Sequence, residues 1–467
     1  MQKGSRFVIS VNRPAILSLI LIAVSAAVLG ANTVGGDVLS HAARILFCAL
    51  CVVGLATSTI REALLLVASL VLGFLILRTS EGYEALWVSM DLAAYFAAFI
   101  VLLTVLKISA ERSRSVLAVG RFLTQQPTGR RFFATAIGGH TLGVFLNFGA
   151  ISLMAPLIQQ SAKDASGHTD KALERRQLSA LLRGFAWILL WAPTTLTQAV
   201  LLALFVDVDV ITLIALGIGT SFLMIMVGKA YDRFEWRDFP LSRAVGLAPK
   251  PPWRSLGILG LVCTSLILSS AFLKIATGYS TALSLMFVAP SVTIIWFALQ
   301  RPPGQRVAHH LKAFWPLLQK GTPGLARSAI ALGLSGFIGR ALAEVLPVES
   351  LTQDLDLSSV PGWLFLAVLP ILITIGGQVA LSPIVLVVFL GQIVQTLPNL
   401  PVEQTYIVFA LSAGWAISMF ASPNATATLL ISATSRIPPT TLTWRWNLKY
   451  GLVSYAVLVL IFILLTF

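Results

Sequence analysis

Residues 404–434 read QTYIVFALSAGWAISMFASPNATATLLISAT, and residues 177–205 read QLSALLRGFAWILLWAPTTLTQAVLLALF. Each stretch is long and apolar enough to cross a bilayer as a helix, but a proline interrupts it near the middle, Pro423 in one and Pro193 in the other. Proline removes one backbone hydrogen bond and clashes with the preceding turn. We therefore predict two broken helices, each made of two half-helices.

Another apolar stretch precedes each broken helix. Residues 133–158 contain Gly138-Gly139-His140, and residues 363–391 contain Gly376-Gly377-Gln378. Glycine pairs let a chain turn and let backbones approach closely. We predict that both stretches are re-entrant hairpins, the first entering from the cytoplasm and the second from outside. Such backbone is tolerated at membrane depth only beside protein or a water-filled cavity, so a polar cavity near the midplane is expected.

The composition indicates an all-α polytopic membrane protein. The chain has 467 residues, of which 57% are hydrophobic and 11% are charged, whereas soluble domains carry about a quarter charged residues. Besides the hairpins, eleven transmembrane helices are predicted. Their approximate spans are 14–31, 43–60, 62–77, 86–107, 177–205, 210–228, 255–275, 279–299, 326–346, 404–434 and 450–467.

The distribution of basic residues sets the expected orientation. With both hairpins turning back, 28 of the 33 Lys and Arg residues fall on the cytoplasmic side, as the positive-inside rule requires. A single crossing by residues 133–158 would move the basic loops 229–254 and 300–327 outside. We therefore expect a bacterial inner-membrane protein with a cytoplasmic N-terminus and a periplasmic C-terminus. The net charge of +14 lies in short connectors, so the partner expected is the lipid bilayer and not nucleic acid.

The order of the predicted elements repeats, which gives the expected domain organisation. Residues 1–40 hold a first transmembrane helix, 41–228 a first repeat, 229–254 a cytoplasmic linker and 255–467 a second repeat of opposite orientation. Each repeat contains one hairpin and one broken helix. Interrupted segments at matching positions of two inverted halves are the best sequence indication of a transporter's binding site.

Polar residues and glycines beside these interruptions are the candidate substrate-binding residues. The ends of half-helices carry partial charges, and their N-termini attract anions. The candidates are Gly139, His140, Thr141, Asn147, Thr194, Thr195, Gly377, Gln378, Ser382, Ser422, Asn424 and Thr426.

Few ionisable residues lie at membrane depth. His140 either contacts substrate or relays a proton, or it is simply a hydrogen-bonded histidine, and the sequence favours neither. For Arg183, snorkelling to the interface is favoured over binding an anion. Arg340 and Glu344 are four residues apart, so an ion pair is expected, and exposure at the membrane interface accounts for Asp91. The scarcity of carboxylates favours a neutral or anionic substrate.

The two breaks resemble those of a known group of transporters. Phe420-Ala421-Ser422-Pro423-Asn424-Ala425 looks like the Thr-Pro-Pro-Asn-Ala break of the divalent anion:sodium symporters, which belong to the ion transporter superfamily, but is one proline shorter. Trp191-Ala192-Pro193-Thr194 is similar to the first-half break of that family. The architecture of eleven helices, two hairpins and two broken helices resembles that family over nearly the whole chain.

This resemblance implies a carrier of dicarboxylates or citrate that forms homodimers through scaffold helices. The family's hairpin tips carry a Ser-Asn-Thr triplet that contacts sodium and the substrate carboxylate. Here Leu146-Asn147-Phe148 keeps only the asparagine, and Leu381-Ser382-Pro383 keeps only the serine. No cofactor is expected other than a coupling Na⁺ or H⁺. If the coupling ion is Na⁺, its site is expected near four side chains, Asn147, Thr194, Ser382 and Asn424.

Three functions are therefore compared. The first is ion-coupled secondary transport of a small carboxylate-like organic anion, and the second is efflux of an oxyanion or a metalloid by the same superfamily. The third is a membrane-embedded polysaccharide polymerase or transferase, which needs a sizeable loop with acid and base groups. The largest predicted loops have about 28 residues and no such cluster, so we do not expect an enzyme.

Overall fold

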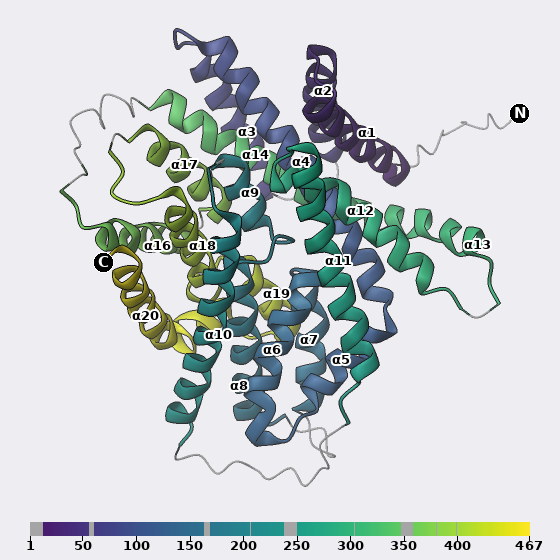
Figure 1. The fold of residues 1–467 in the computed structure, drawn as a ribbon, viewed down its shortest axis with the longest axis vertical. Helices are drawn as coiled ribbons and strands as arrows, with labels where there is room; N and C mark the ends of the chain where they lie inside the picture. The colour runs from purple at the N-terminus through teal and green to yellow at the C-terminus, as the bar shows by residue number, and fades with distance from the viewer. Residues whose placement is uncertain are drawn as a thin grey trace, which may run out of the picture.

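The computed structural model describes ten parts of the chain, within which the only regular secondary structure is helical (Figure 1). The described residues are 13–55, 60–162, 169–205, 207–237, 250–302, 304–346, 357, 359–379, 381–397 and 399–467. The predicted class, an all-α polytopic membrane protein, is confirmed. The middle of the predicted linker, 238–249, lies outside the described residues, as does most of the loop between the last scaffold helix and the second hairpin.

Seven helices form one group, which we call the scaffold. They are α1 (Arg13–Thr33), α2 (Asp37–Gly54), α3 (Ile60–Ile76), α4 (Gly82–Arg112), α11 (Trp253–Thr277), α12 (Thr281–Leu299) and α14 (Phe314–Val345). α4 and α14 pack along each other at its centre. α3 then packs on α14, and α12 packs on α4, so that each central helix carries a partner from the other half of the chain. The short helices α5 (Arg114–Thr124) and α13 (Val307–Lys312) lie in its connections.

The remaining helices form a second group, the hairpin core. Its first half contains α6 (Thr128–Leu146), α7 (Gly149–Ser161), α8 (Lys171–Ala186), the 3₁₀ turn η2 (Trp187–Leu190), α9 (Leu196–Leu204) and α10 (Val210–Glu235). Its second half contains α16 (Gly362–Gln378), α17 (Pro383–Thr396), α18 (Gln404–Ala421), α19 (Thr426–Ser435), η3 (Thr441–Arg445) and α20 (Leu448–Thr466). The segments predicted as hairpins correspond to α6–α7 and α16–α17, and those predicted as broken helices to α8–η2–α9 and α18–α19.

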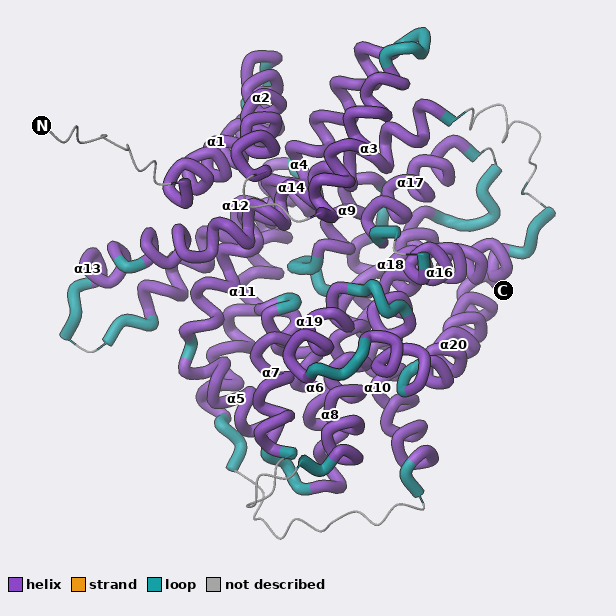
Figure 2. Tube along the Cα trace, turned by 180° about the vertical axis from the view of Figure 1, so that it is seen from behind, coloured by secondary structure: helices purple, strands orange, loops and turns teal. Residues whose placement is uncertain are grey.

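The second arm of each hairpin packs on a helix of the other half of the hairpin core. In each half, the first hairpin arm packs on the first half-helix of the same half, α6 on α8 and α16 on α18. The second arms cross over, so that α7 packs on α19 and α17 packs on α9. Figure 2 shows these elements from behind, with loops between α7, α18 and α19 inside the bundle. The cross-over brings both hairpin turns and both breaks to the same place.

Nine helical segments in the described residues are long and apolar enough to span a membrane, compared with eleven predicted crossings. Two predicted spans account for the difference. α3 has 17 residues, and the span 177–205 is divided into pieces of 16, 4 and 9 residues. The proline break makes each piece shorter than the roughly 20 residues that a continuous span needs.

A buried polar cluster fastens α8 to α10 and α20. Arg176 forms a two-pronged ion pair with Asp232, at 3.0 and 2.6 Å. Arg183 donates to Asn447 Oδ1 at 2.7 Å, and its guanidinium lies 4.6 Å from the centre of the Tyr450 ring. Only 3% of Arg183 is exposed, so the prediction that it snorkels to the interface is wrong. Fixed acceptors and aromatic ring faces around Arg183 make burial of this cation tolerable.

A polar cavity of about 330 Å³ lies between the scaffold and the hairpin core, lined by side chains that include Asp91, Arg340 and Gln392. The predicted ion pair between Arg340 and Glu344 is confirmed, and Arg340 also bonds Gln392 on α17. The Asp91 side chain is 44% exposed and faces this cavity. It also accepts two hydrogen bonds of 2.7 Å from Arg44, a partner that the sequence pattern did not reveal.

Candidate functional site

Both hairpin turns and both helix breaks border one small cavity of about 50 Å³. Its lining comes from α6–α7, η2–α9, α17 and α18–α19. The lining residues are Asn147, Phe148, Leu189, Leu196, Thr197, Ser382, Pro383, Ile384, Trp415, Met419 and Thr426. This cavity is the candidate binding site.

Four helices begin at the cavity. The lining includes the residue before α7, the first residues of α9, the first residues of α17, and Thr426, the first residue of α19. The first N–H groups of a helix have no partner within it, and they carry partial positive charge. These four helices have 13, 9, 14 and 10 residues, long enough for each to contribute. The cavity is therefore favourable for negative charge.

Three oxygen atoms of the lining residues have no hydrogen-bond partner among the described residues. They are Asn147 Oδ1, Thr197 Oγ1 and Ser382 Oγ, and all three are buried. Ser382 precedes α17 as its N-cap residue, yet its side chain makes no capping bond. A buried polar atom without a partner costs about 1–3 kcal/mol. The amide oxygen of Asn147 and the hydroxyl oxygens of Thr197 and Ser382 are suitable ligands for a hard cation, because such ions prefer oxygen ligands.

The backbone at the first hairpin turn is strained. Asn147 has φ 50° and ψ −130°, a conformation that residues with a Cβ rarely adopt. Its N–H bonds the Gly143 carbonyl at 2.7 Å, and its carbonyl accepts from the Ala150 N–H at 3.0 Å. These bonds hold the residue at the turn. Strain that persists at a cavity is characteristic of binding sites.

Matching side chains satisfy the carbonyl groups that the breaks leave free. Gln198 Nε2 donates to the Leu189 carbonyl at 2.8 Å, and Thr428 Oγ1 donates to the Met419 carbonyl at 2.9 Å. In both cases the second half-helix bonds a residue nine positions earlier. Gln198 also bonds Ser412 Oγ at 3.1 Å, which joins α9 to α18. Interrupted backbone is thereby tolerated inside a membrane protein.

Of the twelve predicted substrate-binding residues, three line the cavity: Asn147, Ser382 and Thr426. Gly139 instead packs on α8, where an added Cβ would lie 2.8 Å from the Leu181 carbonyl oxygen. Thr141 is partly buried on α6 and does not line the cavity.

Four other predicted residues tie the second break to the second hairpin. Ser422 Oγ donates to the Gly377 carbonyl at 2.6 Å. Asn424 Nδ2 donates to the Gly377 and Gln378 carbonyls, at 3.2 and 3.1 Å. Gln378 Nε2 donates to the Ala421 carbonyl at 3.2 Å, and its Oε1 accepts from the Trp444 indole of η3 at 3.0 Å. These side chains fix the shape of the break and do not line the cavity.

The first break is held in a similar way. Thr194 Oγ1 donates to the Val144 carbonyl at 2.6 Å, and Thr195 Oγ1 donates to the Ala192 carbonyl at 2.7 Å. Of the four residues expected near sodium, Asn147 and Ser382 line the cavity. Thr194 Oγ1 instead bonds the Val144 carbonyl, and Asn424 is exposed and donates through Nδ2 to the second hairpin.

His140 has a partner for each ring nitrogen. Its Nδ1 lies 3.1 Å from the Gly184 carbonyl oxygen, so it donates there as N–H. Its Nε2 accepts from the Trp191 indole at 3.1 Å. This arrangement requires a neutral ring, because a protonated Nε2 could not accept from Trp191. His140 therefore positions α6 against α8 and the first break, and it does not line the cavity.

Replacing His140 with alanine should lower stability without changing the pH dependence of transport. The Trp191 indole and the Gly184 carbonyl would both lose their partner, at a cost of about 1–3 kcal/mol. Thermal unfolding of the purified variant measures the loss, and solute uptake at several pH values measures the second effect. A shifted pH profile with unchanged stability would instead assign His140 a proton-relay role.

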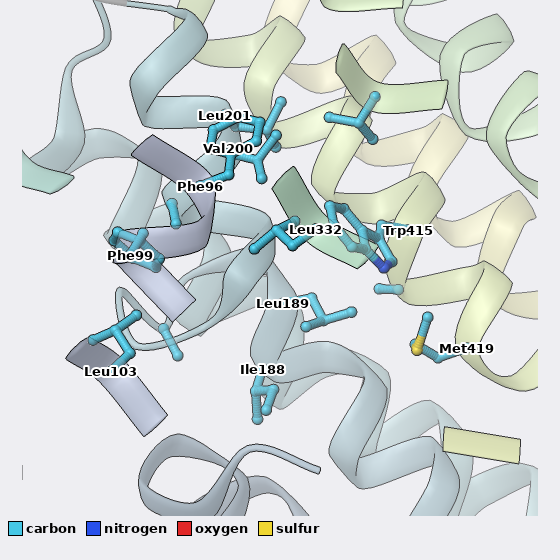
Figure 3. Packing of buried hydrophobic residues seen from close by; sticks show 14 of the residues in the cluster. Phe96, Phe99, Leu103, Ile188, Leu189, Val200, Leu201, Leu332, Trp415 and Met419 are labelled. Atoms are coloured by element: carbon cyan, nitrogen blue, oxygen red, sulfur yellow. The ribbon is translucent and has the colours of Figure 1, made fainter. Parts of the chain in front are cut away.

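Thr197 is a polar cavity-lining residue that sequence reasoning missed. It lies fully buried in the first turn of α9, two residues after the predicted Thr195. A threonine two residues beyond a break is an ordinary helix residue in the sequence, and the packing of α17 on α9 brings it to the cavity that Ser382 also lines. Figure 3 shows Leu189 on η2 in the same part of the core as Trp415 and Met419 on α18, and these three residues form part of the apolar lining.

Comparison with known proteins identifies transporters of the same fold. No protein-family model matches this chain, and no curated protein sequence is similar to it. The YdaH transporter of Alcanivorax borkumensis is 17% identical, with a TM-score of 0.52 over 90% of this chain and 97% of YdaH. MtrF of Neisseria gonorrhoeae, described as one of a class of antimetabolite efflux pumps, is 13% identical, with a TM-score of 0.53 over 88% of this chain and 96% of MtrF. The chain therefore has the fold of these membrane transporters over nearly its full length.

Proposed function

We propose that this protein is a secondary active transporter that moves a small organic anion across the membrane, coupled to Na⁺, by alternating access. The observation that carries the proposal is one cavity at which four helices begin and whose lining residues include three with an unpartnered oxygen. It supports binding of an anion and a cation at neighbouring positions, which is what coupled transport requires. The transporter fold shared with YdaH and MtrF supports the general class.

The four helix N-termini support an anionic solute. They provide N–H donors and partial positive charge without a buried Lys or Arg in the lining. A carboxylate can accept hydrogen bonds from such donors. The similarity of the breaks to those of divalent anion:sodium symporters also implies a carboxylate solute. An oxyanion is matched equally well, so it is the second candidate solute.

The choice of coupling ion follows from the chemistry of the lining. None of its eleven described residues is Asp, Glu or His, so no lining side chain could carry a proton near neutral pH. Asn147, Thr197 and Ser382 present neutral oxygens, which suit Na⁺. Coupling to Na⁺ is therefore favoured over coupling to H⁺ at this site.

The size of the cavity and the packing of the two halves support alternating access. A volume of about 50 Å³ admits a small ion with little water, so an organic solute needs the hairpin turns to separate. Each turn belongs to a hairpin whose second arm packs on the opposite half, an arrangement expected of two inverted repeats. Movement of the hairpin core against the scaffold would open the cavity to one side at a time. The polar cavity beside Asp91 and Arg340 offers a path between the two groups.

Counterflow in proteoliposomes tests the proposal. Vesicles loaded with unlabelled succinate, citrate, arsenate or phosphate are diluted into the matching labelled solute, with and without a Na⁺ gradient. We expect accumulation of one carboxylate that requires Na⁺ and is lost on replacing Thr197 with valine. The structural likeness to MtrF makes measurement in both directions necessary, because MtrF is described as an efflux pump. Accumulation of oxyanions alone would favour the second solute class, and no counterflow with any solute would contradict the proposal.

A further inference from the structure

The connection between α12 and α14 is an exposed basic segment, which we call the basic elbow, residues 300–320 without Pro303. It contains Arg301, Arg306, Lys312 and Lys320, and all four are exposed. No Asp or Glu occurs in the sequence between Asp238 and Glu344. Within the described chain, none of these four cations has a carboxylate partner. The elbow, marked by α13, projects from the side of the molecule in both views (Figures 1 and 2).

The length of α14 places the elbow at a membrane surface. A helix of 32 residues is roughly 48 Å long, whereas the hydrocarbon core of a bilayer is about 30 Å thick. Because the elbow cations lie at the N-terminal end of α14, we place the excess length there, with the first turns in the headgroup region. Trp315, 40% exposed, lies in these turns, and tryptophan is enriched at that depth.

An apolar cavity of about 210 Å³ begins beside the same turns. It lies between α1, α4 and α14, and its lining is almost entirely aliphatic. The lining residues are Ser18, Leu21, Ile22, Ser25, Ala26, Leu29, Val101, Leu102, Val105, Leu318, Thr322 and Leu325. Along α1 it extends from Ser18 to Leu29, roughly 16 Å. A cavity with this length and an aliphatic lining suits a hydrocarbon chain.

The hydroxyl groups in this cavity are already satisfied. Ser18 and Thr322 bond each other at 2.7 Å, and Ser25 donates to the Leu21 carbonyl at 2.8 Å. Water enters a cavity only where several polar partners remain available, and apolar cavities instead hold apolar ligands. Leu318 belongs to the elbow and also lines the cavity, so the basic elbow adjoins that end of it. Lys320 itself lies on the opposite face of α14, because it is two positions from both Leu318 and Thr322.

We propose that this site binds an anionic phospholipid, with one acyl chain in the apolar cavity and the headgroup phosphate beside the basic elbow. A linear apolar cavity with cations at one end matches an amphiphile that carries a negative head. Clusters of basic residues at the end of a transmembrane helix attract anionic lipids, each cation contributing severalfold to binding. The proposal concerns the scaffold and does not depend on the transported solute.

Native mass spectrometry of delipidated protein tests the headgroup contacts. The protein is incubated with equal amounts of palmitoyl-oleoyl phosphatidylglycerol and the matching phosphatidylcholine, and retained lipids are counted. We expect a preference for phosphatidylglycerol that falls about 100-fold in the triple variant Arg306→Gln, Lys312→Gln, Lys320→Gln. The matched control, Arg436→Gln, Arg445→Gln, Lys449→Gln, removes three exposed cations elsewhere and should keep the preference. Equal loss in both triple variants, or no loss in the first, would overturn the proposal.

A second variant tests the acyl-chain cavity. Ala26→Phe would fill part of the cavity and should reduce retention of both lipids, whereas Leu19→Phe, on an exposed position of α1 outside the lining, should not. Exchanging the elbow cations for one another, as Arg306→Lys, Lys312→Arg and Lys320→Arg, should keep the preference, because only charge is required. An Ala26→Phe protein that retains its lipids but loses a dimeric species would show that a second copy of the chain covers this face, against the proposal.

Discussion

Replacing Gly184 with alanine should unfold or severely destabilise the hairpin core. An added Cβ at this position of α8 would lie 2.0 Å from the Ala136 carbonyl oxygen and 2.6 Å from its Cα, and both atoms belong to the backbone of α6. No side chain can rotate away, so the two helices must separate. Separation also breaks the bond from His140 to the Gly184 carbonyl. Overpacking of this severity costs about 3 kcal/mol or more.

Size-exclusion profiles and tryptophan-monitored thermal unfolding of the purified variant measure this loss. Gly219→Ala on α10 is the matched control, because nothing lies within 4 Å of the position of its added Cβ. Alanine is the better helix former, so the control should be as stable as the parent or slightly more stable. A Gly184→Ala protein with parental stability would show that α6 and α8 do not pack as closely as described.

Two substitutions at Asn147 should change sodium dependence in opposite directions. Asn147→Gly removes Oδ1 and suits the positive φ of 50°, so the turn should be retained while a cation ligand is lost. We expect the half-saturating Na⁺ concentration for uptake to rise roughly 10- to 100-fold, the equivalent of about 1.5–3 kcal/mol. Asn147→Asp keeps an oxygen and adds negative charge, so it should lower that concentration.

The effect of Asn147→Asp on uptake distinguishes a cation site at Asn147 from an anion site. If Asn147 contacted the carboxylate of the solute, Asn147→Asp would repel the solute and abolish uptake, which would contradict the sodium assignment. Ser382→Ala should act in the same direction as Asn147→Gly, because it deletes a second unpartnered oxygen. Ser152→Ala on α7 is the control, since this exposed hydroxyl bonds only the carbonyl of its own helix.

The hydrogen bonds of His140 argue against coupling of transport to protons at this cavity. Since both of its nitrogens are bonded within the protein and the cavity lining has no acid or histidine, a proton-coupled cycle would need groups away from this cavity. A Na⁺ requirement together with a flat pH profile in both parent and His140→Ala would be consistent with the proposed mechanism.

The sequence by itself determined the class of protein and the position of its interruptions. Apolar runs and scarce charges fix a helical membrane protein, because exposed backbone polar groups are too costly in lipid. Pro193 and Pro423 fix the breaks, since proline acts on its own helix through sterics and one lost hydrogen bond. Arg340 and Glu344 could likewise be paired from their spacing of one helical turn.

Only the tertiary structure decided which polar residues face the cavity and which hold the backbone. Asn147 and Thr194 are both polar residues beside an interruption, yet one oxygen is unpartnered at the cavity and the other is bonded to Val144. The buried position of Arg183 could not be predicted, because its acceptor Asn447 is 264 positions away in the sequence. Thr197 reaches the site only through the cross-over of α17 onto α9. Contacts of this kind depend on how distant helices pack, and local periodicity carries no information about them.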